Sequence, residues 1–431
     1  MEMVDLKRGC DIPQRAISEG RRMKIAHIAP PWITIPPKNY GGTEIVVYNL
    51  IEEQVSQGHD VTLFAPGDAK TSAKLVSFYP KSLIDDGIPW PAHLKAFYHL
   101  YKSLEYAKDF DIVHTHLSSG SDLYIFPLTA SLSTPHVTTL HSRFPFDRVG
   151  EWTGEADKYY MEWAPQVPMV AISESAKTEV SYDLNFVGVV HHGLPMKEFR
   201  PTGAKREDFF VWLGRIVPDK GTHLAVEAAK KAKVPIVLAG TVDCHQPDSV
   251  RYYEEAVKPQ IDDDQVKYIG PVNMEQKIEL LSQARGFLNP IRWEEPFGMV
   301  MIEAMALGCP VISFTRGAAS EIIVHRKTGF LVHDVKEMVQ FIPRIDEIDR
   351  NAARMHVERN FSATAMATKY TKIYKKVILE SKTASTRRYA PVPTGKALIT
   401  PPPVAKTTEA VQLPSLAAQS ARVTVEMEPK I

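Results

Sequence analysis

Short runs of β-branched and aliphatic residues alternate along the chain with longer stretches in which apolar residues recur at helical spacing. The short runs indicate buried strands, and the longer stretches indicate amphipathic helices. In the first half we expect strands at residues 24–29, 61–65, 112–116, 137–140, 169–172 and 187–190, and helices at 43–57, 91–108, 121–131, 156–164 and 173–182. In the second half we expect strands at 209–213, 235–239, 266–269, 286–288, 310–313 and 329–331, and helices at 220–233, 249–257, 274–284, 298–307 and 335–341.

This alternation predicts an α/β fold, because a helix between two strands returns the chain for parallel pairing. Residues 193–205 contain Pro195, Pro201 and Gly203 and are the expected linker between two domains. We therefore expect two facing Rossmann-like domains with doubly wound parallel sheets, the first at 23–200 and the second at 201–360. Ligands bind such sheets beyond the carboxyl ends of the strands, so the cleft between the domains is the expected site.

Both ends of the chain differ from the middle. Residues 1–22 are charged and lack the apolar core of a secretory signal, so we expect a flexible N-terminal extension there. Residues 382–431 are rich in Pro, Thr, Ala and Lys and almost free of aromatic residues. Such a segment buries too little apolar surface to fold, which predicts a disordered tail.

The chain has 431 residues, of which 51 are Lys or Arg and 51 are Asp or Glu. Its balanced charge gives no general attraction for nucleic acid or an anionic membrane, and three scattered cysteines form no disulfide framework. The longest apolar run, 297–314, includes Glu303 and Pro310, which argues against a transmembrane segment. We therefore expect a soluble, cytoplasmic protein. Aromatic residues at helical spacing in 91–108 indicate a buried face, with a peripheral membrane or partner contact as the alternative.

The segment from Trp293 to Glu303 carries the most information about chemistry. It leaves a strand and enters a helix near Gly298, so the free amides of the first helical turn can bind a phosphate. The residues that supply these amides are Phe297, Gly298, Met299 and Val300. Glu295 and Glu303 would then lie on either side of a diphosphate, suited to sugar hydroxyls. The helix dipole alone can explain acidic residues before the helix, but it explains Glu303 among apolar neighbours poorly.

The loop after strand 209–213 holds a second candidate. Arg215 and Lys220 can converge on one anion, the first as a planar fork and the second as a point charge. An ordinary solvated loop is the alternative. Because this loop leaves the same sheet edge as the segment that contains Glu295, we favour an anion-binding site.

Gly41 and Gly42 lie between the first strand and the first helix. Two glycines allow the backbone to approach a ligand closely, although a plain helix cap fits equally well. The pattern is not the Gly-x-Gly-x-x-Gly of dinucleotide-binding proteins, which argues against a nicotinamide-dependent oxidoreductase.

Several histidines end strands of the first half. His141 follows strand 137–140 and is expected at the cleft. His114 and His116 could bind a metal, but no third ligand at a recognised spacing accompanies them, so we expect no metal site. We interpret His191 and His192, like His114, as polar residues of the cleft floor. The Asp-x-Asp segments at 109–111 and 262–264 precede strands and are interpreted as solvated turns.

Together these segments resemble the retaining glycosyltransferases of family 4 (group 1), which have the two-domain GT-B fold. The resemblance covers residues 24–379. It rests on Gly41-Gly42-Thr43-Glu44, Ala171-Ile172-Ser173-Glu174-Ser175, Gly214-Arg215 with Lys220-Gly221, and Glu295-Pro296-Phe297-Gly298 with Glu303. By the same resemblance, residues 361–381 are the closing helix that crosses back to the N-terminal domain.

The resemblance implies a nucleoside-diphosphate sugar, most simply UDP- or GDP-linked, on the C-terminal domain and a hydroxyl acceptor on the N-terminal one. The acceptor could be a sugar, a glycolipid or a small molecule. The residues that it assigns to catalysis are Arg215, Lys220, Glu295 and His141. The residues that it assigns to donor binding are Gly41, Gly42, Arg215, Lys220, Val272, Glu295, Phe297, Gly298, Met299, Val300 and Glu303.

The implied reaction is transfer of a hexosyl group with retention at the anomeric carbon, without a metal or another cofactor. Fixed cations and backbone amides would stabilise the charge that develops on the leaving diphosphate. The alternatives are a nucleotide-sugar epimerase or a glycoside phosphorylase of the same fold, and a non-catalytic protein that binds nucleotide sugars.

Overall fold

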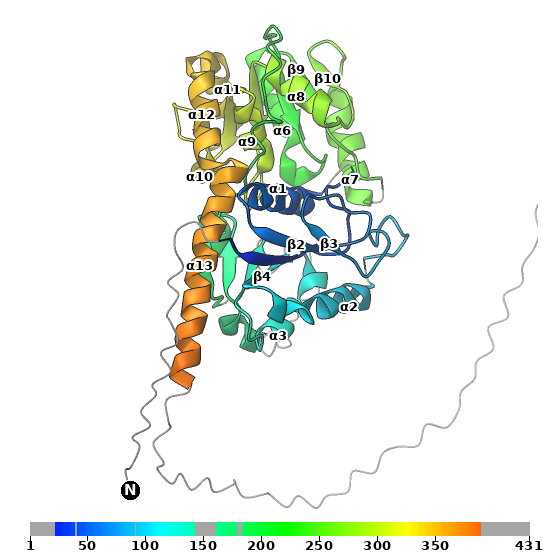
Figure 1. Ribbon diagram of the computed structural model, residues 1–431. Helices are drawn as coiled ribbons and strands as arrows, with labels where there is room; N and C mark the ends of the chain where they lie inside the picture. The colour runs from blue at the N-terminus through cyan, green and yellow to red at the C-terminus, as the bar shows by residue number, and fades with distance from the viewer. Residues whose placement is uncertain are drawn as a thin grey trace, which may run out of the picture. The chain divides into compact units, whose positions relative to one another are not determined.

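The computed structural model describes residues 22–38, 41–90, 92–142, 161–178, 183–244 and 246–388 (Figure 1). Within these ranges the chain forms two parallel sheets, one in each half. This arrangement confirms the expected α/β fold with two doubly wound, Rossmann-like domains. None of the helices in the described ranges combines the length and the apolar character that a membrane span requires.

The first sheet has seven described strands in the order β3-β2-β1-β4-β5-β6-β7. Their bounds are β1 (Lys24–Ile28), β2 (Asp60–Phe64), β3 (Lys74–Val76), β4 (Ile112–Leu117), β5 (His136–Leu140), β6 (Met169–Ala171) and β7 (Phe186–Val189). The chain moves outward in one direction from β1 to β3 and in the other from β4 to β7. The crevice at which the strand order reverses therefore lies between β1 and β4, where His27 is paired in register with His114.

The second sheet repeats this topology with six described strands in the order β10-β9-β8-β11-β12-β13. Their bounds are β8 (Phe210–Leu213), β9 (Ile236–Ala239), β10 (Val266–Tyr268), β11 (Gly286–Asn289), β12 (Val311–Phe314) and β13 (Gly329–Val332). Here the order reverses between β8 and β11, so the loops that follow these two strands flank the expected ligand crevice.

Helices cover both sheets (Figure 1). The α-helices are α1 (Gly42–Ser56), α2 (His93–Leu104), α3 (Ile125–Thr129), α5 (Glu174–Thr178), α6 (Thr222–Ala232), α7 (Pro247–Tyr252), α8 (Met274–Gln283), α9 (Met299–Ala306), α10 (Ala319–Ile322), α11 (Val335–Phe341), α12 (Arg350–Asn360) and α13 (Ala363–Arg388). Shorter helical turns are η1 (Ala107–Asp109), η2 (Gly120–Asp122), η3 (Met161–Gln166), η4 (Pro218–Lys220), η5 (Tyr253–Val257, a π-helix), η6 (Lys258–Gln260) and η7 (Ile342–Glu347).

Some expected elements differ from the structure. Strand β3 was not predicted, because a three-residue, partly exposed edge strand carries no apolar run. The helix expected at 121–131 is split into η2, closed by a capping box of Ser119 and Asp122, and the short α3, which contains Pro127. Residues 156–160 and 179–182 of two other expected helices lie outside the described residues.

The tyrosines of α2 lie at the surface, contrary to our expectation of a buried aromatic face, whereas Phe97 is half-buried. Tyr98 and Tyr101 are each 47% exposed, and Tyr106 just beyond the helix is 43% exposed. The buried residues of α2 are Ala96, His99, Leu100 and Ser103. These side chains follow the helical spacing of a buried face, and the tyrosines lie outside it.

Helix α13 returns to the first half and runs along it (Figure 1). Tyr370 and Tyr374 are buried in the core cluster of that half. The linker is tied to the start of α13, because the Leu194 amide donates to the carbonyl of Phe361 and the Ala363 amide donates to that of Leu194, both at 2.8 Å. The helix continues past the boundary that we expected at residue 382. Residues 1–21 and 389–431 lie outside the described part.

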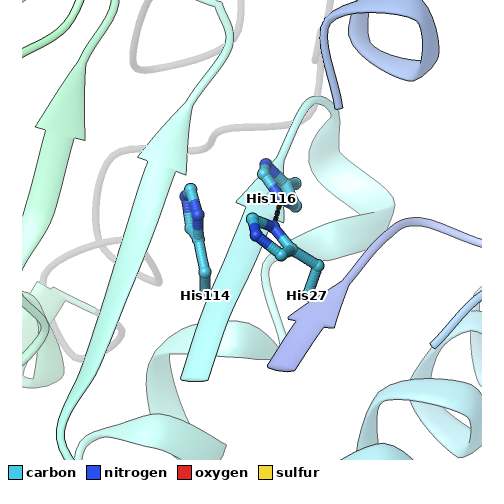
Figure 2. Close-up of side chains that lie close together, drawn as sticks. All are labelled: His27, His114 and His116. Atoms are coloured by element: carbon cyan, nitrogen blue, oxygen red, sulfur yellow. Dashed lines mark hydrogen bonds between the residues drawn. The ribbon is translucent and has the colours of Figure 1, made fainter. Parts of the chain in front are cut away.

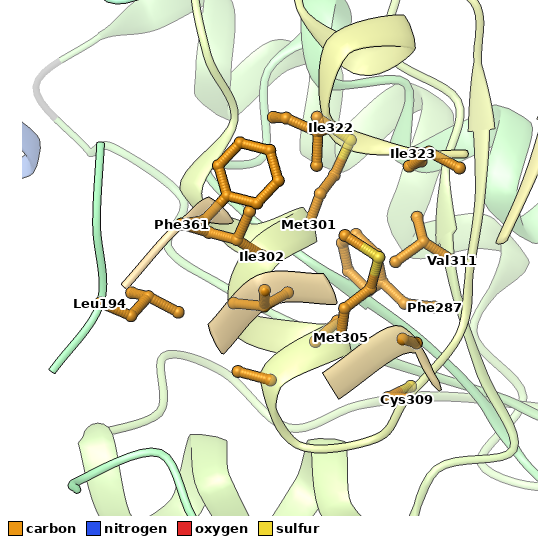
Figure 3. Packing of buried hydrophobic residues seen from close by; sticks show 14 of the residues in the cluster. Leu194, Phe287, Met301, Ile302, Met305, Cys309, Val311, Ile322, Ile323 and Phe361 are labelled. Atoms are coloured by element: carbon orange, nitrogen blue, oxygen red, sulfur yellow. The ribbon is translucent and has the colours of Figure 1, made fainter. Parts of the chain in front are cut away.

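The core of the second half surrounds α9 (Figure 3). Met301, Ile302 and Met305 project from this helix into a cluster with strands β11 and β12. Phe361 and the linker residue Leu194 belong to the same cluster. Helix α9 is therefore anchored by its packing in this core.

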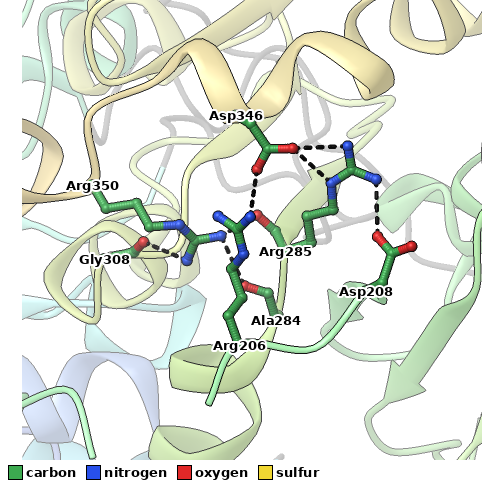
Figure 4. Close-up of polar contacts among 7 residues, drawn as sticks. All are labelled: Arg206, Asp208, Ala284, Arg285, Gly308, Asp346 and Arg350. Atoms are coloured by element: carbon green, nitrogen blue, oxygen red, sulfur yellow. Dashed lines mark hydrogen bonds and ion pairs between the residues drawn. The ribbon is translucent and has the colours of Figure 1, made fainter. Parts of the chain in front are cut away.

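Charged residues close the opposite, amino edge of the second sheet (Figure 4). The Arg285 guanidinium donates to Asp208 at 2.9 Å and to Asp346 at 2.8 Å. Arg350 donates to the carbonyl of Gly308 at 2.8 Å. Asp208, Arg285 and Gly308 precede β8, β11 and β12, respectively. This network therefore ties the amino ends of these strands together, on the edge opposite the candidate site.

Candidate active site

The two loops that leave the switch point of the second sheet lie against each other. Gly221 has a φ of 67°, and a Cβ atom there would come within 2.0 Å of the carbonyl oxygen of Pro290. The Arg292 amide donates to the carbonyl of Asp219 at 2.8 Å. These contacts hold the loop after β8 beside the loop after β11, and only glycine permits the close approach.

A cation and a carboxylate meet where these loops touch. The Lys220 ammonium donates to Oε2 of Glu295 in an ion pair. The Trp293 indole N–H donates to the same oxygen at 3.1 Å, and the ammonium lies 5.3 Å from the centre of the Trp293 ring. The ring contact adds a cation–π interaction, so Lys220 is fixed in place. The structure therefore brings Lys220 to Glu295, which lies three residues before Gly298 in the sequence.

Helix α9 begins directly after this pair. Gly298 is its N-cap and has a left-handed backbone with a φ of 92°. The amides of the first turn have no intrahelical partners, and the helix dipole adds positive potential at that end. The Phe297 side chain is buried between His192 and Phe361, so its backbone alone is available to a ligand. Met299 and Val300 are partly buried against the core.

Glu303 lies one turn further along α9 and is 8% exposed. Its Oε1 accepts a hydrogen bond from the Lys277 ammonium of α8 at 2.7 Å. This ion pair explains how a carboxylate persists among apolar neighbours. The second carboxylate oxygen of Glu303 has no such ion-pair partner among the described residues.

Arg215 and Val272 are both half-buried on the loops of the second half. Arg215 comes two residues after β8, on the same loop as Lys220. Val272 follows β10 and lines a shallow groove with Pro271, Gln276 and Leu280. The two residues are thus on loops of the carboxyl edge, as expected, with Val272 on the outermost of them.

The two glycines of the first half differ in their surroundings. A Cβ atom at Gly41 would come within 2.7 Å of Glu44 and of Pro37, so Gly41 is needed for packing. A Cβ atom at Gly42 would meet nothing within 4 Å. Gly42 is therefore the one of the pair whose backbone is open to a ligand. Burial raises the pKa of the nearby Glu44 carboxyl to about 7.

His141 lies at the end of β5 and connects the first half to the start of α9. Its ring stacks on His192 with 5.3 Å between centroids, and His192 meets the Phe297 ring edge-on at 5.0 Å. Burial lowers the pKa of His141 to about 3, so its imidazole is neutral. The ring contacts thus link His141, through His192, to Phe297 just before α9.

A third imidazole accompanies the His-x-His pair of β4. His27 on the neighbouring strand β1 faces His116, with 3.1 Å between Nδ1 of His27 and Nε2 of His116, and His114 lies beside them (Figure 2). Spacing along the sequence does not reveal this neighbour, because strand pairing brings it there. His114 is also bonded to the Tyr374 hydroxyl at 2.7 Å and to the Thr139 hydroxyl at 2.6 Å. A cation would have to displace bonds that the imidazoles already make.

The two halves are joined through short polar contacts near the site. The Ser173 hydroxyl of the first half donates to the carbonyl of Pro296 at 2.6 Å. The Glu321 carboxylate of the second half accepts the amides of Glu174 and Ser175, at 2.8 and 2.9 Å, and pairs with His191 at 2.9 Å. His191 is thus a bridging residue rather than part of a cleft floor.

Several of these residues were not singled out by the sequence. Lys277 gives no signal, because a lysine on a solvated helix is ordinary. Trp293 was within the informative segment, but its indole N–H was not expected to position Glu295. Ser173 and Glu174 belong to a motif of the family resemblance, and the structure shows that they join the domains.

The chain matches the family descriptions "Glycosyltransferase Family 4" over residues 40–198 and "Glycosyl transferases group 1" over residues 196–364. The O-antigen chain mannosyltransferase C of Escherichia coli is 24% identical over 388 residues, which cover 84% of this chain and 100% of that protein. Sucrose-phosphate synthase from Thermosynechococcus elongatus is a structural neighbour with a TM-score of 0.65 and 21% identity, over 83% of this chain and 100% of that one. HepE of Anabaena, solved in complex with UDP, has a TM-score of 0.61 and 17% identity, over 82% of this chain and 100% of that one.

The two family matches meet at the linker, and the structural neighbours match the fold over more than four fifths of this chain. The expected family and fold are therefore confirmed: the chain belongs to the group 1 glycosyltransferases of family 4, and it is a glycosyltransferase with the GT-B fold.

Proposed function

We propose that this glycosyltransferase moves a hexosyl group from a nucleoside-diphosphate sugar, UDP- or GDP-linked, to a hydroxyl acceptor. The observation that carries the proposal is the ion pair of Lys220 and Glu295 directly before the N-terminus of α9. A cation, a carboxylate and first-turn amides are what a diphosphate joined to a sugar requires. The UDP complex of HepE, a neighbour with this fold, supports a nucleotide donor.

The diphosphate would bind between Lys220, Arg215 and the amides of residues 297–300. It would compete with Glu295 for the ammonium of Lys220. Glu295 would then be free to accept hydroxyls of the donor sugar, while the Trp293 N–H still orients it. The ligand would thus replace the ion pair with two contacts, one from Lys220 to the diphosphate and one from Glu295 to the sugar. Only a ligand that carries both a diphosphate and a sugar can make both contacts.

Glu303 would bind the ribose hydroxyls of the nucleotide. The Lys277 ammonium holds one of its oxygens, which leaves the other to accept from the ribose. The loop with Val272 would contact the base. On the first half, the open backbone at Gly42 would lie over the diphosphate, and His141 would contact the sugar.

We propose, in line with the family resemblance, that the reaction retains the anomeric configuration. The bond from the anomeric carbon to the phosphate oxygen breaks as the acceptor oxygen attacks from the same face, and the acceptor proton passes to the departing oxygen. Positive charge develops on the sugar ring and negative charge on the diphosphate. Lys220, Arg215 and the helix amides would stabilise the leaving group, so we propose that the reaction proceeds without a metal.

Thermal unfolding in the presence of UDP-, GDP- and ADP-sugars tests the donor site, because binding to the folded state raises the melting temperature. We expect one nucleotide class to stabilise the protein. Lys220→Ala and Glu303→Ala should each remove most of that shift. Lys231→Ala is the matched control, since Lys231 forms an exposed ion pair on α6 and should leave the shift unchanged. Full retention of the shift in both site variants would overturn the proposal.

The stereochemistry is tested by the product. An acceptor panel with the stabilising donor should give a glycoside with the anomeric configuration of the donor in proton NMR. An inverted product would overturn the retaining mechanism. Conversion of the donor alone to its epimer, or synthesis of a sugar phosphate from glycoside and phosphate, would instead identify an epimerase or a phosphorylase.

A further inference from the structure

A chain of hydrogen bonds leads from the interior of the first half to His141. The amide oxygen of Gln54 on α1 lies 2.7 Å from Nε2 of His27. Nδ1 of His27 lies 3.1 Å from Nε2 of His116, and Nδ1 of His116 lies 3.0 Å from Nε2 of His141. Three imidazoles are thus connected in one line, and both ring nitrogens of His27 and His116 are used.

Each of these imidazoles is neutral. His27 is 0% exposed and His116 is 1% exposed. Burial lowers the pKa of His27 to about 4 and that of His116 well below its ordinary value. A neutral imidazole has one N–H donor and one acceptor nitrogen. In a chain of such rings every bond must therefore run in the same direction, and the group at the end decides which direction that is.

Gln54 is that end group, and its amide lies between His27 and the hydroxyl of Tyr374 on α13. The NH2 of this amide donates to the hydroxyl at 3.2 Å, and its oxygen faces His27. The Tyr374 hydroxyl, which accepts from Gln54, then donates to Nδ1 of His114 at 2.7 Å. That oxygen can only accept, so His27 carries its proton on Nε2 and offers a lone pair at Nδ1. Nε2 of His116 must therefore carry a proton and donate to Nδ1 of His27, and Nδ1 of His116 is left as an acceptor. His141 must then donate from Nε2 as well, which leaves Nδ1 without a proton.

The other nitrogen of His141, Nδ1, is buried and has no hydrogen-bond partner among the described residues. The ring that carries it stacks on His192, and His192 meets Phe297 just before α9. A buried acceptor without a partner is costly unless a ligand supplies the donor.

We propose that Gln54 and Tyr374 act through His27 and His116 as positioning residues that fix the tautomer of His141, so that its Nδ1 accepts a hydrogen bond from a hydroxyl of the bound sugar. The ligand part of this inference rests on the proposed function. The tautomer part rests on the hydrogen-bond chain alone. Helix α13, which crosses from the second half, would thereby set which sugar group the first half can recognise.

A metal bound by the same histidines would have the opposite effect. A cation between His27 and His116 would take the lone pairs of Nδ1 and Nε2 that now share a hydrogen bond. His116 would then carry its proton on Nδ1 and donate to His141. The tautomer of His141 would be reversed, with its proton on Nδ1. The direction of the chain therefore distinguishes the two arrangements.

Long-range proton–nitrogen correlation spectra of the full chain, labelled with 15N-histidine, test the tautomers directly. His141→Asn assigns the signals of His141 by their loss. We expect His27, His116 and His141 to be neutral with the proton on Nε2. A proton on Nδ1 of His141 would overturn the inference, and so would metal analysis of the purified protein that finds one bound transition-metal ion per chain.

Two tyrosines one turn apart on α13 provide a matched pair of variants. Both are buried, and both hydroxyls are hydrogen bonded, that of Tyr370 to the Thr139 hydroxyl at 2.8 Å. Tyr374→Phe removes the hydroxyl that accepts from Gln54 and is also bonded to His114, so we expect His141 to show a mixture of tautomers. Tyr370→Phe should leave His141 in one tautomer. Equal spectra for the two variants would overturn the role of Tyr374, and the wild-type spectrum decides the tautomer even if a variant does not fold.

Donor analogues test the sugar contact. Fluorine replaces a hydroxyl in size but cannot donate a hydrogen bond. We expect one position of the stabilising donor at which fluorine weakens binding to the wild type by about fivefold to tenfold. The His141→Ala variant should bind this analogue and the parent donor with equal affinity. If fluorine at every position has the same effect on the wild type and on His141→Ala, the sugar contact of His141 is overturned. If no nucleotide sugar binds at all, the proposed function and the sugar contact fail together, whereas the tautomers remain as measured.

Discussion

The carboxyl edges of the two sheets have the same topology but opposite chemistry. At the edge of the first sheet, polar groups are buried histidines such as His27, His116 and His141, held by neutral hydrogen bonds. At the edge of the second sheet, they are ion pairs, Lys220 with Glu295 and Lys277 with Glu303. Both edges lie at the point where the strand order reverses.

Depth of burial accounts for the difference. Side chains of the two ion pairs are between 10% and 22% exposed, so water and the partner together keep the charges stable. His27 and His116 are at most 1% exposed, and a charge there would lose nearly all of its hydration. The ion-paired lysines of the second edge can therefore neutralise an anion, whereas the described histidines of the first edge offer fixed neutral donors and acceptors.

The largest effect should come from separating the two loops of the charged edge. Gly221→Ala places a methyl group against the carbonyl of Pro290 at a backbone with positive φ. We expect a loss of about 3–4 kcal/mol in the free energy of unfolding, together with loss of nucleotide binding. Gly203→Ala is the control, because its φ is 72° but nothing lies within 4 Å. Equal losses in the two variants by urea denaturation would contradict the contact between the loops.

Acid should weaken the neutral edge. Burial lowers the pKa of His99, which donates to the carbonyl of Ala29 after β1, to about 4. Protonation then favours the unfolded state, so stability is full above pH 6.5 and falls as the pH drops toward 4. His99→Gln should lose less stability over this range, by about 3 kcal/mol. Denaturant titrations of both proteins from pH 7 to pH 4 measure the difference. Parallel pH profiles would rule out a buried neutral His99.

The ion pair of Glu303 should behave as a unit. Lys277→Met leaves a nearly buried carboxylate without its partner, and we expect a loss of about 2 kcal/mol in stability. The double variant Lys277→Met, Glu303→Met should recover most of it, because no charge remains to be paired. A double variant that is less stable than Lys277→Met in the same denaturation assay would argue against this account.

The smallest effect concerns the contact between the edges. Ser173→Ala removes the hydroxyl that donates to the carbonyl of Pro296 and accepts the amide of Ala176. We expect a loss of about 1 kcal/mol in stability. Thr178→Val at the exposed end of the same helix is the control and should change stability little. If the control loses as much as Ser173→Ala, the contact adds nothing specific.

The repeated alternation of strands and helices was enough to predict both sheets, because a buried parallel strand is a continuous apolar run. The expected strand at 24–29 is β1 to within one residue, and that at 209–213 is β8. Strand β3 was not predicted, because edge pairing is not visible in a local pattern. The burial of the α2 tyrosines was predicted wrongly, because the local pattern does not show which residues of the helix are buried.

The candidate site was predictable where its residues belong to one segment. Glu295, Gly298 and Lys220 lie where their strand-to-helix loops place them. The partners of these residues were not predictable, because Lys277 reaches Glu303 from another helix and His27 reaches His116 through strand pairing. The amide–imidazole chain to His141 depends on α13, more than 200 residues away in sequence, and is a property of the folded chain only.

The central claim is that the charged edge binds the diphosphate through Lys220. Calorimetric titration of UDP and GDP into the wild type, Lys220→Met and Lys231→Met tests it most directly. We predict that one nucleotide binds the wild type and Lys231→Met equally, and that Lys220→Met binds it at least about tenfold more weakly, as expected for the loss of a charge-assisted contact. Equal affinity for the wild type and Lys220→Met would contradict the claim.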